Sequence, residues 1–131
     1  MRIKNFDIID NLGGICKKQT GLFSPHHEKH YLKITIKDLT TGEKTEKRTF
    51  YQYNPQATIY KDGDGVLAVV NDALCAASCP GFLDFCREFG YSTSAPKARG
   101  AFKACKNSLD FFESAGLRVA DLVKIQEKLD F

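Results

Sequence analysis

The chain has 131 residues, of which 43% are hydrophobic and 27% charged, with a formal net charge of +3. This composition is ordinary for a globular protein and excludes wholesale disorder, and the length suits one domain. The mild positive charge permits nucleic-acid binding without requiring it, and it excludes a strongly acidic mimic of DNA.

Cysteine usage and the N-terminus predict a cytoplasmic protein. Five cysteines are an odd number and too sparse for a disulfide scaffold. Residues 1–7 lack an apolar signal core and contain an early acid, Asp7. The longest apolar run, residues 65–70, is far too short to cross a bilayer. We therefore expect no membrane segment.

Residues 1–60 are predicted to form strands. Leu32, Ile34 and Ile36 alternate with Lys33, Thr35 and Lys37, and this period of two is typical of a half-buried strand. Turn-forming residues at 38–43 then predict a hairpin. The predicted strands, of which the second is the weakest, cover residues 3–10, 15–23, 31–37 and 44–53.

Residues 66–130 are predicted to be helical, because apolar residues recur there at helical spacing. Gly90 is placed to end the second helix, and Ser94 or Thr93 is expected to cap the third, with Pro96 in its first turn. The predicted helices cover residues 66–79, 81–89, 96–115 and 118–130. The fold class is therefore α+β, a single domain over residues 1–131 in which an antiparallel sheet of three to four strands packs against three to four helices.

Histidines and acids offer weak metal-site candidates. His26, His27 and His30 lie close together, with Cys16 upstream, but nothing at standard spacing completes a zinc tetrahedron, so a solvated loop is favoured. The segment from Asp62 to Gly65 resembles part of a calcium loop, but the first and last ligand positions do not match. A turn before a helix is the better interpretation.

The cysteines of the helical half are predicted to be packing groups. Cys86 and Cys105 fall in apolar stripes, where a free cysteine behaves as a small hydrophobe. Cys75 and Cys79 are one turn apart and could supply half a metal site, but core packing is favoured. We therefore predict no catalytic residue, no cofactor and no bound metal.

Basic residues beside aromatics mark two candidate contact surfaces. The hairpin surface comprises Lys33, Lys37, Lys47, Arg48, Tyr51 and Tyr53. The helix surface comprises Lys97, Arg99, Lys103 and Lys106, with the last three predicted on a face opposite the seam of Phe102 and Leu109. Such groups suit phosphate contact with base stacking, or a protein partner. The alternative is an ordinary solvated helix and an edge strand protected by lysines.

Residues 82–91, FLDFCREFGY, are followed by Ser94, Lys97-Ala98 and Phe102-Lys103-Ala104-Cys105. In this pattern, over residues 66–113, the chain resembles a group of small phage and prophage proteins that carry F-x-x-F-C-x-E-F-G-Y, a Ser-x-x-Lys-Ala stretch and an aromatic-x-Ala-Cys. The chain differs in residues 92–96, where that group tends to have acids, and in its extension past Gly116. The group has no assigned activity, so the resemblance implies a mobile-element origin and a bacterial host.

We therefore expect a non-enzymatic protein that binds a host protein or complex, such as an inhibitor of CRISPR or another host defence. A nucleic-acid-binding phage accessory protein is the second hypothesis. A small metalloprotein or enzyme around the three histidines is the third. The oligomeric state is not predicted.

Overall fold

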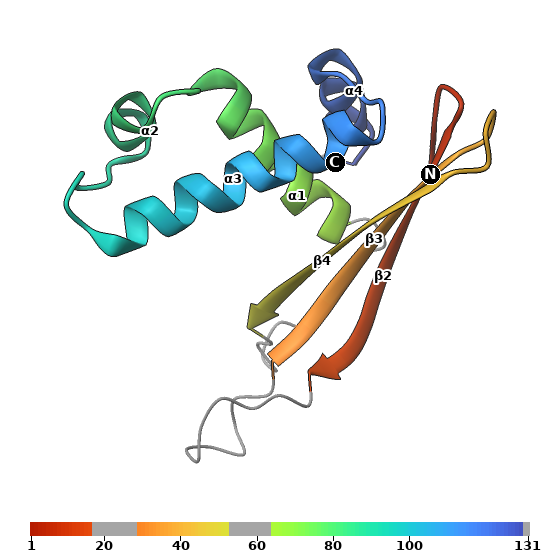
Figure 1. The fold of residues 1–131 in the computed structure, drawn as a ribbon, viewed down its shortest axis with the longest axis horizontal. Coiled ribbons are helices and arrows are strands. Elements are labelled where there is room, and N and C mark those ends of the chain that lie inside the picture. The colour runs from red at the N-terminus through yellow and green to blue at the C-terminus, as the bar shows by residue number, and fades with distance from the viewer. Residues whose placement is uncertain (17–28, 53–63, 130–131) are drawn as a thin grey trace. The chain divides into compact units, whose positions relative to one another are not determined.

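The computed structural model describes residues 1–16, 29–52 and 64–129. Within them, four strands precede four helices (Figure 1), which confirms the predicted α+β class. The chain divides into two compact units, Met1–Val66 and Leu67–Phe131, and each is described by itself. The strands are β1 (Arg2–Ile3), β2 (Phe6–Cys16), β3 (Lys29–Asp38) and β4 (Lys44–Gln52), and the helices are α1 (Asp64–Ser78), α2 (Phe82–Phe89), α3 (Pro96–Ser114) and α4 (Val119–Leu129).

The sheet is antiparallel, with the strand order β1-β2-β3-β4. The strand predicted at residues 3–10 is broken at a turn where Lys4 has a φ of 52°, and the second part continues to Cys16. The Leu39 N–H donates to the Asn5 carbonyl at 2.7 Å, which ties this turn to the β3–β4 hairpin. Most of the weak strand predicted at residues 15–23 lies outside the described residues.

The two faces of the sheet differ as the alternation in β3 predicted. Ile8, Ile34 and Ile36 are at most 2% exposed and share the inner face, since Ile8 lies opposite Ile36 in the register. Lys33 and Lys37 lie on the other, outer face, because successive side chains of a strand point to opposite sides.

The hairpin between β3 and β4 is closed by Asp38. Its carboxylate accepts the Thr40 N–H at 2.9 Å, and its carbonyl accepts the Gly42 N–H at 2.7 Å. Gly42 has a φ of 78°, which glycine adopts at little cost. The turn chemistry predicted for residues 38–43 therefore forms as local hydrogen bonds.

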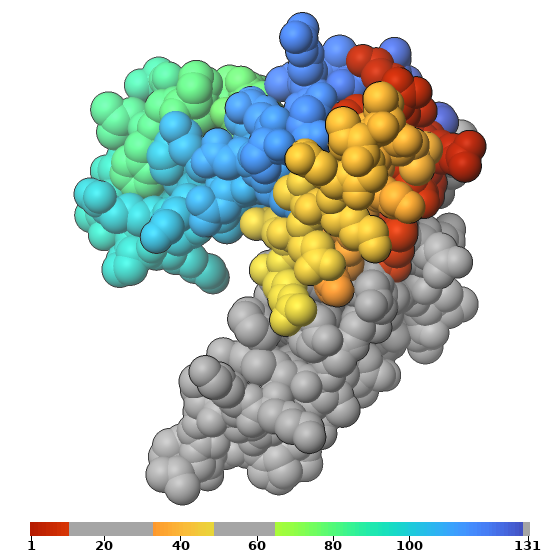
Figure 2. All heavy atoms as spheres, turned by 45° about the vertical axis from the view of Figure 1, so that its right-hand side comes forward, coloured from red at the N-terminus to blue at the C-terminus, as the bar shows by residue number. Residues whose placement is uncertain are grey.

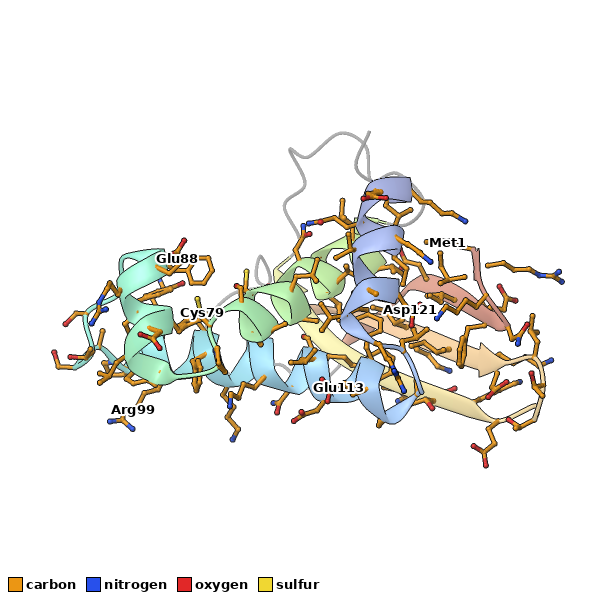
Figure 3. All side chains as sticks on the ribbon, turned by 90° about the horizontal axis from the view of Figure 1, so that it is seen from above. Met1, Cys79, Glu88, Arg99, Glu113 and Asp121 are labelled. Carbon is orange, nitrogen blue, oxygen red and sulfur yellow. The ribbon has the colours of Figure 1, made fainter. Side chains whose placement is uncertain are left out.

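The four predicted helices of the second unit are confirmed to within two residues at each end. The largest fully buried side chains of this unit are Phe112, Leu117, Leu122 and Ile125. Buried Asp121 accepts the N–H of Arg118 at 2.9 Å, and this bond is half of a capping box at the start of α4 (Figure 3).

The ends of α2 and α3 test the predicted caps. Gly90 adopts a left-handed φ of 74° and ends α2, as predicted. The prediction that Ser94 or Thr93 caps α3 is wrong, because the N-cap is Ala95 and its side chain cannot accept a hydrogen bond. The Ser94 hydroxyl pairs with that of Ser92 at 3.0 Å instead, while Pro96 takes the first helical position as predicted.

Candidate binding face on helices α2 and α3

Aromatic rings join α2 to α3. The ring of Phe85 is 2% exposed, and its centroid lies 4.9 Å from Phe89, 5.8 Å from Tyr91 and 5.3 Å from Phe102. Phe82 and Phe102 meet edge to face at 5.5 Å and are only half-buried. Edge-to-face and offset contacts of this kind add to the burial of each ring, so the short α2 is held in place by its neighbour.

A buried cluster lies beneath these rings. It consists of Ala76 in α1, Cys79 directly after α1, Phe85 in α2 and Cys105 in α3. Figure 3 labels Cys79 at the end of α1. The predicted burial of Cys105 is confirmed, as is that of Cys86, which is 2% exposed. Phe102 and Leu109, predicted to be interior, pack at the margin of the cluster and remain half-buried.

Two of the cysteine thiols are held in their neutral form. Burial raises the pKa of Cys105 to about 11, with further contributions from the negative charge of Asp72 and from Cys75. Burial also raises the pKa of Cys75, again with Asp72 and then Cys79 adding to the effect. Because the thiolate is the nucleophile and the metal ligand, this environment disfavours both kinds of chemistry at Cys75 and Cys105.

Cations from α3 lie over the half-buried rings. The guanidinium carbon of Arg99 is 5.3 Å from the centroid of Phe82, and the Lys106 ammonium is 5.1 Å from that of Phe102. The prediction that these cations lie opposite the Phe102 seam is therefore wrong. At 3.6 residues per turn, Lys106 follows Phe102 by about one turn, so the two side chains are neighbours.

We call Phe82, Phe102, Arg99, Lys103 and Lys106 the cation–aromatic face. All three cations are exposed, and Figure 3 shows Arg99 at the outside of the helical unit. In the space-filling view, α2 and the first half of α3 form adjacent parts of one surface (Figure 2). Lys97 is also exposed but lies elsewhere, because residues two apart in a helix do not face each other.

No carboxylate of the described residues is within ion-pair distance of the three cations, although Asp110 follows Lys106 by about one turn of α3. The first turn of α3 contains no acid, although helix N-termini favour negative side chains. Across the described part of the chain, no ion pair involves Arg99, Lys103 or Lys106. The three cations are therefore available to negative groups of another molecule.

The predicted hairpin surface does not form as one face. The register places Lys33 opposite Arg48 and Lys37 opposite Lys44, all on the outer face of the sheet. Lys47 lies opposite Ile34 and so belongs to the inner face, away from the other basic residues.

The side chains of the two tyrosines predicted on the hairpin surface are not among those that the structure describes. Tyr51 is paired with His30 in the register of β3 and β4, and Tyr53 lies outside the described residues. The structure therefore describes no aromatic side chain beside the outer lysines.

The proposed metal ligands are only partly described. His26, His27 and Asp62 lie outside the described residues, and His30 lies in β3 opposite Ile15. Gly65, in the first turn of α1, donates its N–H to the Asp10 carboxylate at 3.2 Å. Among residues 1–16, 29–52 and 64–129, no group of three or more His, Cys, Asp or Glu side chains could hold a metal ion.

Sequence reasoning missed a groove between α1 and α4. Its volume is about 620 Å³, and Leu74, Ala77, Val119 and Gln126 are among its lining residues. The Gln126 amide donates to the Asn71 side chain at 2.8 Å across it. No sequence pattern indicates this groove, because its walls are 41 or more residues apart and meet only in the folded unit.

Comparisons with known proteins give no relative: no family model, no curated protein and no solved structure matches the chain. In the described helices, no single one is long and apolar enough to span a membrane. Residues 65–78 and 82–89 reach that length and composition only as a pair, which is bent by 119°.

Proposed function

We propose that the protein is a non-enzymatic binding protein whose cation–aromatic face docks on an acidic surface of a protein partner. The observation that carries this proposal is the set of three exposed α3 cations without a carboxylate partner in the described residues. Complementary charge of this kind steers association and fixes the register of an interface.

The rings beneath the cations favour a binding role. Arg99 and Lys106 rest on Phe82 and Phe102, so these long side chains lose less conformational freedom when a partner binds. Leu83 and Phe89 of α2 are 64% and 41% exposed and add apolar area beside the charges. Arginine and aromatic side chains together are enriched among the residues that dominate interface energies.

The same geometry favours a protein over nucleic acid at this face. Base stacking on Phe82 or Phe102 needs an accessible ring surface. Arg99 and Lys106 already cover one surface of each ring. We therefore assign the face to an acidic protein surface, and the resemblance to small phage proteins supports a host defence complex as the partner.

The test begins with capture of host proteins on the immobilised chain, followed by affinity measurements with the purified partner. The charge-reversed variant R99E/K103E/K106E is expected to raise Kd by at least a hundredfold, since each close charge pair contributes about 1 kcal/mol or more. The control K97E/K124E reverses the charge of two exposed lysines outside the face. It should bind as tightly as the unmodified chain.

A second readout is biological. Expression of the chain in a host that carries the captured defence system should restore phage plaques, and R99E/K103E/K106E should not. A partner that binds this variant as well as the unmodified chain would refute the assignment of the face. Plaque counts that the chain never changes would refute the role in host defence.

A further inference from the structure

The outer face of the sheet carries a second concentration of positive charge, separate from the face proposed above. Its described members alternate along each strand with the positions of the inner face, as the register shows. They are the cations Arg2, Lys33, Lys37, Lys44 and Arg48, the acids Asp7 and Glu46, and the uncharged Ile9 and Thr35.

Two pairs of like charges lie directly opposite each other on this face. Lys37 is opposite Lys44, and Lys33 is opposite Arg48. Side chains in such positions are about 5 Å apart at Cβ, and like charges there destabilise a sheet. An acid lies opposite only one of these four residues, since Asp7 of β2 is opposite Lys37.

The acids of the face relieve only part of this repulsion. Glu46 pairs with Lys33 at 3.2 Å, and Asp7 lies 3.6 Å from the N-terminal ammonium. No ion pair of Lys37 or Lys44 occurs in the described segments of the chain. Lys37 has Asp7 opposite it in β2, whereas Lys44, in the last strand of the described sheet, has only Lys37 as its cross-strand neighbour.

We propose that the outer face of the sheet binds the phosphate backbone of a nucleic acid, with Lys37 and Lys44 at its centre and Lys33 and Arg48 extending it. Lys33 and Lys37 are four residues apart in β3, which is about 13 Å along an extended strand. That length matches about four phosphate steps of one DNA strand at 3.4 Å each. A polyanion laid along β3 and β4 contacts both pairs of basic residues and adds negative charge beside Lys44.

The binding is independent of base sequence. Contacts of lysine and arginine with phosphate oxygens carry no sequence information. Between the two cation pairs the register places Thr35 opposite Glu46, so the phosphates contact the cations on either side of this acid. Backbone neutralisation supplies most of the affinity of such a site, which gives Kd values of about 10⁻⁴ to 10⁻⁶ M at physiological salt.

The test is fluorescence anisotropy of labelled single-stranded and duplex oligonucleotides of one mixed sequence, titrated with the full chain over a range of KCl concentrations. We expect binding that weakens steeply with salt. For the duplex, K37Q/K44Q should lower the slope of log K against log salt by about 1.8, because each lost phosphate contact removes about 0.9. The charge-conserving K37R/K44R should keep the slope.

A variant of the other surface separates the two proposals. K103Q/K106Q removes the same charge from the cation–aromatic face and should leave the nucleic-acid slope unchanged. Absence of salt-dependent binding at low salt would overturn the proposal. It would also be overturned by an unchanged slope in K37Q/K44Q, or by a loss that only K103Q/K106Q causes. Circular dichroism of each variant checks that the sheet and helices are retained.

Discussion

Truncation of Phe85 tests whether the aromatic contacts hold α2 in place. Phe85 is 2% exposed and contacts three other rings at centroid distances of 4.9 to 5.8 Å. Phe85→Ala removes this buried ring and leaves a cavity in the cluster with Cys79 and Cys105. Substitutions of this kind cost about 3–5 kcal/mol, of which each lost ring pair accounts for about 0.5–1.5 kcal/mol.

The assay is urea denaturation followed by far-ultraviolet circular dichroism, with the free energy of unfolding extrapolated to water. Leu83→Ala is the matched control, because Leu83 lies in the same helix but is 64% exposed. It should change the free energy of unfolding by less than about 0.5 kcal/mol. A loss below about 1 kcal/mol for Phe85→Ala would refute the argument that this ring anchors α2.

The remaining predictions concern a cap, a charge pair and a thiol. Ala95→Ser should stabilise the protein to urea by about 1 kcal/mol, since α3 has no side-chain cap and Ala95 already has the extended backbone that caps use; no gain would contradict this reasoning. Lys44→Glu should raise the free energy of unfolding by roughly 0.2–1 kcal/mol, because it turns a cross-strand repulsion with Lys37 into an attraction, and a lower value would contradict the register. Alkylation of Cys105 by iodoacetamide at pH 8, followed by mass spectrometry, should be about a hundredfold slower than in the urea-unfolded chain, since burial raises its pKa from 9.0 to about 11. Equal alkylation rates in the folded and unfolded chain would contradict the burial of this thiol. The same pKa shift should lower the free energy of unfolding as the pH rises from 9 to 11, because the unfolded chain loses this proton first.

The sequence alone was sufficient for the four helices and for the β3–β4 hairpin, but it did not predict the break between β1 and β2. Strict alternation in β3, the turn residues from Asp38 to Gly42, and the stop at Gly90 each act over a few residues. Local hydrogen bonding and side-chain periodicity decide such features, so they can be inferred from neighbouring residues. The N-cap of α3 was predicted wrongly. The capping position is Ala95, and the hydroxyl of Ser94 is hydrogen-bonded to that of Ser92.

The positions of the cations relative to the rings are partly encoded in the sequence. A helical wheel places Lys106 one turn from Phe102, so that contact could have been predicted. The contact of Arg99 with Phe82 could not, because it depends on how α2 packs against α3. The separation of Lys47 from Lys33 likewise depends on the register of β3 and β4, where a shift of one residue exchanges the two faces.

Periodicity thus determined which residues share a stripe on each helix or strand. Only the packing of α2 on α3, and the pairing of β3 with β4, decided which stripes meet. The physical reason is that these contacts join residues distant in the chain, and their energies depend on the mutual orientation of whole elements.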